Sequence, residues 1–231
     1  MAVAFTALAA MSTSTANATS YAGTAGTPAA GDLLICFVTA TAEATVAATM
    51  TGTWTWTLLT SFKYNSGADS IYVFWAYASA ATSTTPTVDF GADAASSCEI
   101  YCYRVTGSSG VSIPCIQQWR ATTGATTNPA LAMYGAINTN SGCLSFVAAN
   151  GTAPAVWTAP TGWAAVVEAG TGTAPKHAAG ASSRTSGETL STITWTNAQT
   201  NPWGGIVLEI CLLGGRQMSP SGGACSSPMF Y

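Results

Sequence analysis

The chain has 231 residues, and only 6% of them are charged, compared with roughly a quarter in an ordinary soluble domain. Six basic and nine acidic residues give a net charge of −3, so the clustered lysines and arginines that bind phosphates are missing and no nucleic-acid partner is expected. No run approaches the ~18 apolar residues that span a bilayer, so no membrane partner is expected either.

Solubility must therefore depend on hydroxyl groups and small side chains, which 43 alanines and 36 threonines supply. We expect much of this weakly charged surface to be covered by partners. The first residues, "MAVAFTALAA", have the small apolar character of a secretion signal but no positively charged region before it, so a cleaved signal is the less favoured interpretation.

The first clear elements are extended. Residues 31–40, "GDLLICFVTA", form a short apolar run after a turn signal, which is typical of a buried strand. In "TGTWTWTLLT", residues 51–60, strict alternation predicts a half-buried strand with Trp54 and Trp56 on one side and threonines on the other. We expect the two tryptophans to anchor this strand to the core, with the threonine face toward solvent or a neighbour.

The next strand is apolar on both faces. In "SIYVFWAYA", from Ser70, Ile71 and Val73 alternate with Tyr72 and Phe74. A sheet with one wet face would show polar residues at alternate positions. This strand is therefore either central and covered on both sides, or part of an interface.

Four segments of the first half recur in the same order about 105 to 110 residues later, which favours an internal duplication over chance similarity. Short strands between Gly, Thr, Ser and Asn clusters predict an all-β protein, a β-sandwich or jelly roll, with little helix. The matched pairs are "GDLLICFVTA" with "SGCLSFVAAN", "WTLLTSF" with "WAAVVEA", "TPTVDF" with "STITWT", and "EIYCYRVTG" with "IVLEICLLG".

The duplication predicts four regions along the chain. Residues 1–120 form the first β half, 121–130 a linker, 131–215 a second β half packed on the first, and 216–231 a C-terminal arm rich in Ser, Gly and Pro. Each half is too small to bury both of its sheets alone, so one fused sandwich is expected.

Seven cysteines are an odd number at irregular spacing, with no CxxC pair, so neither a metal site nor a disulfide framework is expected. Cys36, Cys143 and Cys211 lie in apolar strand patterns, where a free thiol behaves as a small buried hydrophobe. Assembly in a reducing cytosol is the favoured interpretation.

Catalytic chemistry finds little support. His177, the only histidine, lies in a Gly- and Ala-rich stretch without a nucleophile elbow, so we expect an exposed loop histidine. Asp89 and Asp93 in "DFGAD" are the nearest pair of carboxylates, but Asp and Gly are favoured turn residues. We expect them to form a turn and the protein not to be an enzyme.

Ligand-binding motifs are equally sparse. "NSGAD", from Asn65 to Asp69, has too few acids for a calcium loop and predicts a hairpin turn instead. No Gly-rich run precedes a helix, so no phosphate-binding loop and no cofactor are expected. Exposed tryptophans can stack on sugar rings, which makes Trp54, Trp119, Trp157 and Trp203 candidates for glycan binding, although packing in a core or interface is favoured.

The duplicated pattern resembles a family of phage and prophage virion proteins, which begin with a short apolar strand and continue through a Thr- and Ala-rich stretch to a "GDLL" strand and a "GWT" strand. Here these elements are "MAVAFTAL", "AAGDLLICFV" and "TGTWTWTLL", followed by "SGCLSFVAANG" and "APTGWAAVV" in the second half. The resemblance covers roughly residues 1 to 215 and implies that the N-terminus is a first strand. The seven cysteines and the doubled "WTW" depart from the family pattern.

This resemblance implies a structural protein located in the virion, similar to head-decoration, head-fibre and tail-associated proteins. A capsid decoration or cement protein that contacts the major capsid protein or other virion proteins is the favoured hypothesis. We expect a homo-oligomer, most simply a trimer. The alternative is a carbohydrate-binding β-sandwich on a tail fibre or bacterial surface, with a glycan partner. The candidate interface residues are Trp54, Trp56, Tyr72, Phe74, Met229, Phe230 and Tyr231.

Overall fold

The computed structural model describes residues 3–41, 47–106, 113–151, 157–172 and 176–213. These residues are almost entirely antiparallel β-structure, and the only helical turn among them is a short 3-10 segment, η1 (Asn65–Gly67). The all-β sandwich predicted from the strand periods is confirmed. Met229, Phe230 and Tyr231, with the rest of the predicted arm, lie outside the described residues.

The first half of the chain forms one large sheet and a small outer sheet. The large sheet has the order β1-β9-β4-β7-β6, with β2 paired to the far end of β9, and the outer sheet has the order β3-β8-β5. The strands are β1 (Ala4–Ala7), β2 (Ser12–Ser14), β3 (Ser20–Ala22), β4 (Leu33–Thr41), β5 (Thr49–Thr51), β6 (Thr57–Tyr64), β7 (Asp69–Tyr77), β8 (Thr87–Asp89) and β9 (Ser97–Thr106).

The second half repeats this plan. Its large sheet has the order β10-β18-β12-β15-β14, and its outer layer consists of the pairs β11-β16 and β13-β17. The strands are β10 (Ile113–Gly124), β11 (Ala130–Ala132), β12 (Gly142–Asn150), β13 (Trp157–Thr158), β14 (Val167–Thr171), β15 (His177–Arg184), β16 (Thr192–Thr194), β17 (Thr196–Asn197) and β18 (Trp203–Leu213).

The two halves have the same topology, strand for strand. β1, β9, β4, β7 and β6 correspond to β10, β18, β12, β15 and β14 in both sheet position and chain order. The four sequence matches fall on β4 and β12, β6 and β14, β8 and β16, and β9 and β18. The internal duplication inferred from the sequence is therefore visible in the fold.

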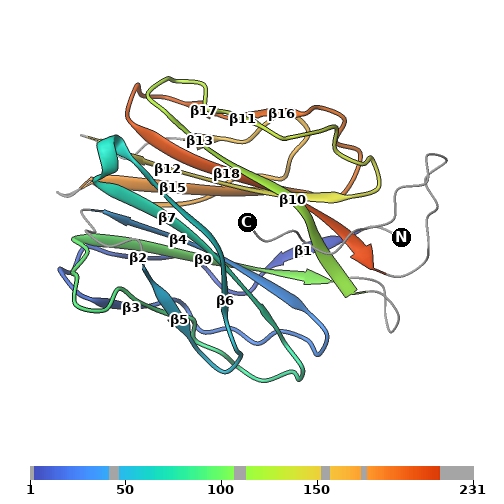
Figure 1. The fold of residues 1–231 in the computed structure, drawn as a ribbon, viewed down its shortest axis with the longest axis horizontal. Coiled ribbons are helices and arrows are strands. Elements are labelled where there is room, and N and C mark those ends of the chain that lie inside the picture. Colours follow the sequence, from blue (N-terminus) through green and yellow to red (C-terminus); the bar gives the residue numbers. More distant parts are fainter. Residues whose placement is uncertain (1–2, 42–46, 107–112, 152–156, 173–175, 214–231) are drawn as a thin grey trace.

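The two large sheets pack face to face, and each outer layer covers the opposite side of its own sheet, so the molecule has four layers (Figure 1). The central core lies between the large sheets, where Phe37 of β4 stacks on Phe146 of β12 with ring centroids 5.1 Å apart. Two further cores lie beneath the outer layers. Every central strand is consequently buried on both faces.

The contacts between the two large sheets are symmetric with respect to the two halves of the chain. β4 lies against β12, β9 against β15, and β7 against β18. Since β9 corresponds to β18 and β7 to β15, the last two contacts are equivalent. The duplicated halves are thus related as the two subunits of a symmetric dimer would be, which is why one fused sandwich forms.

The strand β7 is central and covered on both sides, as one of the two alternatives for "SIYVFWAYA" predicted. Ile71 and Val73 lie in the central core, whereas Tyr72 and Phe74 lie in the core beneath the outer sheet. Tyr72 is 0% exposed and Phe74 is 1% exposed. Their assignment to an interface with another chain was wrong, because the chain's own outer sheet covers them.

The strand predicted for residues 51–60 is displaced. β5 ends at Thr51 and β6 begins at Thr57, so Trp54 and Trp56 lie in the connection between these strands. Both tryptophans still pack half-buried on the core beneath the outer sheet, as predicted. Alternation alone did not reveal that Gly52, with φ of 158°, interrupts the extended run.

The predicted linker is also misplaced. Residues 121–124 belong to β10, which pairs with β18 along its whole length, so β10 is the first strand of the second half. The boundary between the halves therefore precedes residue 113 rather than following residue 120. The "ATTG" sequence looked like a linker because an edge strand can be made of small polar residues.

The expectation of free thiols in the strands was wrong for two of the three cysteines named. Cys36 of β4 is bonded to Cys102 of β9, and Cys115 of β10 to Cys211 of β18. Each bonded pair occupies directly opposed positions of neighbouring strands. Cys98 and Cys143 are free and buried, so only part of the thiol prediction is confirmed.

Close packing between the sheets predicts a specific cost at Gly204 in β18. A Cβ atom there would lie 2.8 Å from Cδ1 of Tyr64 and 3.1 Å from Cδ1 of Ile71. We expect Gly204→Ala to lower the free energy of unfolding by about 1–3 kcal/mol, measured by urea denaturation. Gly135→Ala is the control, since nothing lies within 4 Å of its Cβ position and stability should not fall. Equal effects of the two substitutions would contradict this packing.

Candidate functional site

The most unusual group of side chains lies between the two large sheets. His177 begins β15 of the second half, and Glu99 lies on the facing strand β9 of the first half. Thr39 of β4 and Tyr64 at the end of β6 complete the group around the imidazole. Four strands from both halves therefore meet at one histidine.

The contacts of this histidine use both of its ring nitrogens. Nδ1 lies 2.5 Å from Oε2 of Glu99, and Nε2 lies 2.7 Å from the hydroxyl of Tyr64 and 3.3 Å from Oγ1 of Thr39. The second carboxylate oxygen of Glu99 accepts a hydrogen bond of 3.2 Å from Oγ1 of Thr13. The side chains of His177 and Glu99 are both 0% exposed.

A buried carboxylate extends the network along the same end of the sandwich. Asp69, at the start of β7, is 0% exposed. It accepts hydrogen bonds from Nδ2 of Asn150, at 3.1 and 3.3 Å, and from Nδ2 of Asn65, at 2.7 Å. Because Asn150 ends β12 of the second half, this is a second polar link between the halves.

The charge state of His177 follows from its neighbours. Burial by itself lowers the pKa of His177, but the charge and hydrogen bond of Glu99, together with Asp69, more than offset this and raise the pKa above its ordinary value. The protonated imidazole forms an ion pair with Glu99 through Nδ1 and donates Nε2–H to the hydroxyl of Tyr64. Burial, followed by the charge of Asp69, raises the pKa of Tyr64 well above its ordinary value, so the phenol stays neutral.

This arrangement can hold the sheets together, but it is not placed for chemistry on a substrate. A hydroxyl, a histidine and a carboxylate occur in the order used for nucleophilic catalysis. However, Tyr64 is only 2% exposed and the other two side chains are fully enclosed. A buried ion pair fixes the register of the elements that it joins, because breaking it leaves an uncompensated charge.

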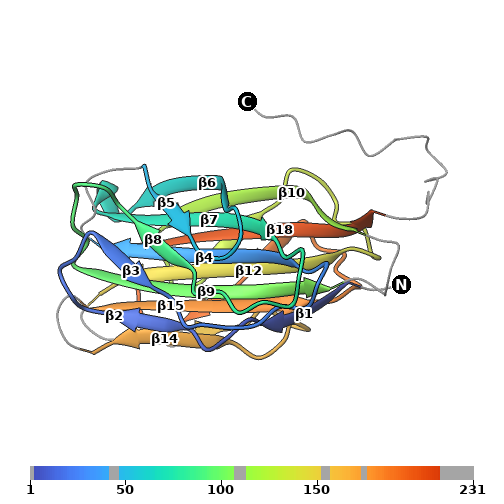
Figure 2. The ribbon, with the colours of Figure 1, turned by 90° about the horizontal axis from the view of Figure 1, so that it is seen from below.

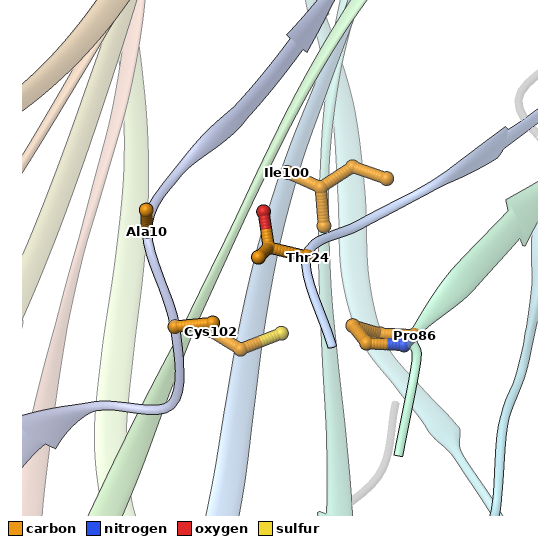
Figure 3. Close-up of a pocket in the computed structure, with 6 residues that line it drawn as sticks. Ala10, Thr24, Pro86, Ile100 and Cys102 are labelled. Carbon is orange, nitrogen blue, oxygen red and sulfur yellow. The ribbon is translucent and has the colours of Figure 1, made fainter. Parts of the chain in front are cut away.

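A cavity in the described residues lies elsewhere and is very small. It is lined by Ala10, Thr24, Pro86, Ile100 and Cys102, between β9 and the outer sheet (Figure 3). Its volume of about 10 Å³ is enough for a single water molecule at most. This cavity therefore has no room for a substrate or cofactor.

The expectation of an exposed loop histidine was wrong. His177 is 1% exposed and lies in a central strand. The surrounding sequence, "HAAGASS", consists of small residues because β15 is packed between β9 and the outer layer, where Cβ on Gly180 would lie 2.8 Å from Trp157. The duplication contained a signal for this strand, since the offset of 107 residues from Trp56 to Trp163 places the start of β7 within one residue of the start of β15.

The turns predicted at Asp89 and at "NSGAD" are present in the structure. Oδ1 of Asp89 accepts a hydrogen bond of 2.7 Å from the backbone N–H of Gly91, whose φ is 70°, so Asp89 closes a turn as predicted. "NSGAD" forms the hairpin turn between β6 and β7, with Asn65 and Ser66 in the left-handed region. No group of three His, Cys, Asp or Glu side chains in the described ranges could hold a metal ion.

The tryptophans do not form a platform for sugars. Trp157 is 4% exposed and Trp203 is 3% exposed, and both lie in the core beneath the second outer layer. Trp54 and Trp119 are half-buried against core residues. The prediction that tryptophans act mainly in packing is confirmed for these four.

Comparisons with protein-family models, curated proteins and solved structures found no match. Within the part of the chain that the structure describes, no helix is long and apolar enough to cross a bilayer. The site must therefore be interpreted from its own geometry.

The buried pair predicts a strong asymmetry between single and double substitutions. His177→Leu leaves Glu99 buried without its counter-charge and should lower the free energy of unfolding by about 3–5 kcal/mol, as should Glu99→Leu. The double variant removes both charges and should recover most of this loss. Urea denaturation of all four proteins gives the coupling energy. Additive effects in the double variant would show that the two side chains do not act as a pair.

The raised pKa of His177 predicts how stability depends on pH. Its contribution is fully present below the unfolded pKa of 6.5 and is lost as the pH rises through the folded pKa. The free energy of unfolding should therefore fall as the pH rises above 6.5 and through the folded pKa, with a slope of at most ~1.4 kcal/mol per pH unit. Above this window the thiols of Cys98 and Cys143, whose pKa values burial raises, add their own dependence.

The control for this measurement is the double Leu variant, since His177 is the only histidine of the chain. Its stability should be flat across the same window. A wild-type protein that gains stability as the pH rises from 6.5 would contradict the protonated assignment.

Proposed function

We propose that this chain is a non-catalytic structural protein of a phage virion, a capsid decoration or cement subunit that stabilises the head. The observation that carries the proposal is the placement of the few charges. Arg104 pairs with Asp32, Arg184 with Glu188, and His177 with Glu99. The acids Asp69 and Glu209 are buried and hydrogen-bonded as well. Eight of the 14 acidic, basic and histidine side chains in the described residues thus act inside the fold, and the surface left for partners is weakly charged.

The strands of the outer layers present mainly hydroxyl and methyl groups. On β5 and β8, Thr49, Thr51 and Thr87 turn away from the core, and on β16 the exposed side chains are Thr192 and Thr194. Such a surface costs less to dehydrate than a charged one, because Asp89 of β8 is the only ionised side chain on the strands of the outer layers. It therefore suits a subunit that is covered laterally by neighbours.

The covalent and ionic links between strands support the same role. Two disulfides fasten β4 to β9 and β10 to β18, and disulfides persist on the surfaces of virions and other particles outside cells. The His177–Glu99 pair joins the two sheets. A decoration subunit must remain folded outside the cell, and each of these links serves that requirement.

The glycan-binding alternative lacks its main supporting feature. It required exposed tryptophans, and each of the eight tryptophans in the chain is buried or half-buried. The exposed large apolar side chains among the described residues are Leu58, Tyr134 and Leu190. Only Tyr134 among these has the aromatic ring that stacks on a sugar.

The proposal predicts oligomerisation and binding to phage heads. The purified protein in native buffer at micromolar concentration should have the mass of a trimer, and it should bind heads from the same phage that lack it. Native mass measurement and co-sedimentation test the two points. Heads that remain unbound would contradict the decoration role, and retention on immobilised glycans in the same experiment would favour the alternative.

A further inference from the structure

The two long sides of the sandwich differ in charge. β6 and β10 lie beside each other along one side, and β14 lies with β1 and β2 along the opposite side (Figure 2). Each of these strands is at an edge of its sheet, so the two sides present the unpaired backbone of the large sheets.

Cations and anions are segregated between these sides. β6 and β10 contain Lys63 and Arg120 and no acidic residue. On the opposite side β14 contains Glu168, and β1, β2 and β14 contain no lysine or arginine. The edge strands of the two sides therefore differ in the sign of their charge, and Lys176 lies outside these strands, in the connection between β14 and β15.

Two exposed apolar side chains lie on or beside the strands of the cationic side, and a third lies on the outer layer next to one of them. Leu58 of β6 is 39% exposed, and Tyr134 is 78% exposed with the guanidinium of Arg120 lying 4.9 Å from its ring centroid. Leu190 is 63% exposed and emerges beside Tyr134, since β11 ends where the antiparallel β16 begins. Tyr and Arg are the residues most enriched at the centres of protein interfaces.

Hydrogen bonds to the carboxylate of Glu188 hold the backbone at Leu190 in place. The backbone N–H of Leu190 donates to Oε1 of Glu188, and Oε2 of Glu188 accepts hydrogen bonds from Trp163 and Arg184. Arg184 and Glu188 neutralise each other, whereas Arg120 forms no ion pair with any described carboxylate. The charge that remains for a partner at this group is that of Arg120.

Strand addition is not the mode of contact that these edges favour. The ladder of β6 shifts register between Leu58 and Thr60, and that of β10 shifts between Ile116 and Gln118. Bulges and a lysine on an edge strand oppose continuous backbone pairing with another chain. A partner would therefore bind through side chains.

We propose that the cationic side of one copy docks on the anionic side of a second copy, with Glu168 of one chain against Arg120 of the next. The inference rests on the proposed function only in that it treats the chain as an assembly subunit. Since the two surfaces are different and lie on opposite sides, the contact is head-to-tail, and it gives a closed ring where the rotation between subunits closes and an open chain where it does not. Tyr134, Leu58 and Leu190 form the apolar part of the contact.

A charge exchange tests this arrangement. Arg120→Glu and Glu168→Arg should each weaken self-association at least about tenfold, because each places like charges against each other. The double variant Arg120→Glu/Glu168→Arg restores opposite charges at every contact and should restore the wild-type oligomer. Sedimentation velocity measures the oligomer, and thermal melting of each variant shows that the sandwich remains folded.

Asp89→Arg is the matched control, since Asp89 is exposed on the outer sheet rather than on a side. It should leave the oligomer unchanged. A double variant that stays dissociated although folded, or a control that dissociates as strongly as Glu168→Arg, would overturn the proposed contact. A wild-type protein that sediments as a monomer would overturn it as well.

Binding to phage heads separates this inference from the proposed function. If wild-type protein binds heads but the single substitutions leave its oligomer unchanged, the docking surface is wrong and the virion role stands. If the charge exchange behaves as expected while heads remain unbound, the docking surface stands and the virion role is wrong.

Discussion

The fold depends on one constraint, which is that the central strands of both large sheets are buried on both faces. Each half supplies one large sheet and the outer layer that covers it, and the two sheets then cover each other. Strands such as β4 are therefore buried at every position. Any polar side chain on such a strand needs a partner within the protein, because water cannot reach it. The ion pair of His177 and Glu99 is the strongest response to this requirement.

The duplication explains how a polar network can arise in such a core. Two related halves that face each other place equivalent strands at equivalent contacts, so β9 against β15 has its counterpart in β18 against β7. Only the first of these contacts carries a charged pair. At the second, Gly204 lies close to Tyr64 and Ile71. The two contacts have therefore diverged. The contact of β9 with β15 contains an ion pair, whereas in the contact of β18 with β7 the backbone approaches its neighbours closely.

Sequence patterns predicted the elements whose environment is local or repeated. The two apolar faces of β7 are evident from Tyr72 and Phe74 alone, and the repeat is evident from four segments. The patterns failed where the environment depends on distant strands. His177 is separated from Glu99 by 78 positions of the sequence, and Cys36 is 66 positions from Cys102. Neither pair has a local signature, because strand order decides which residues meet.

The four-layer architecture also limits how the protein can meet a neighbour. Its sheet faces are already covered, so unpaired backbone of the large sheets is available only along the two sides. The bulges in β6 and β10 oppose strand addition at one of these sides, so the side chains there determine which partner binds. The chain has few charges, and Arg120 is the only lysine or arginine of β10. Its unpaired guanidinium therefore has no second positive charge beside it on that strand. Specificity at such a surface can therefore rest on one charge pair set within an apolar contact.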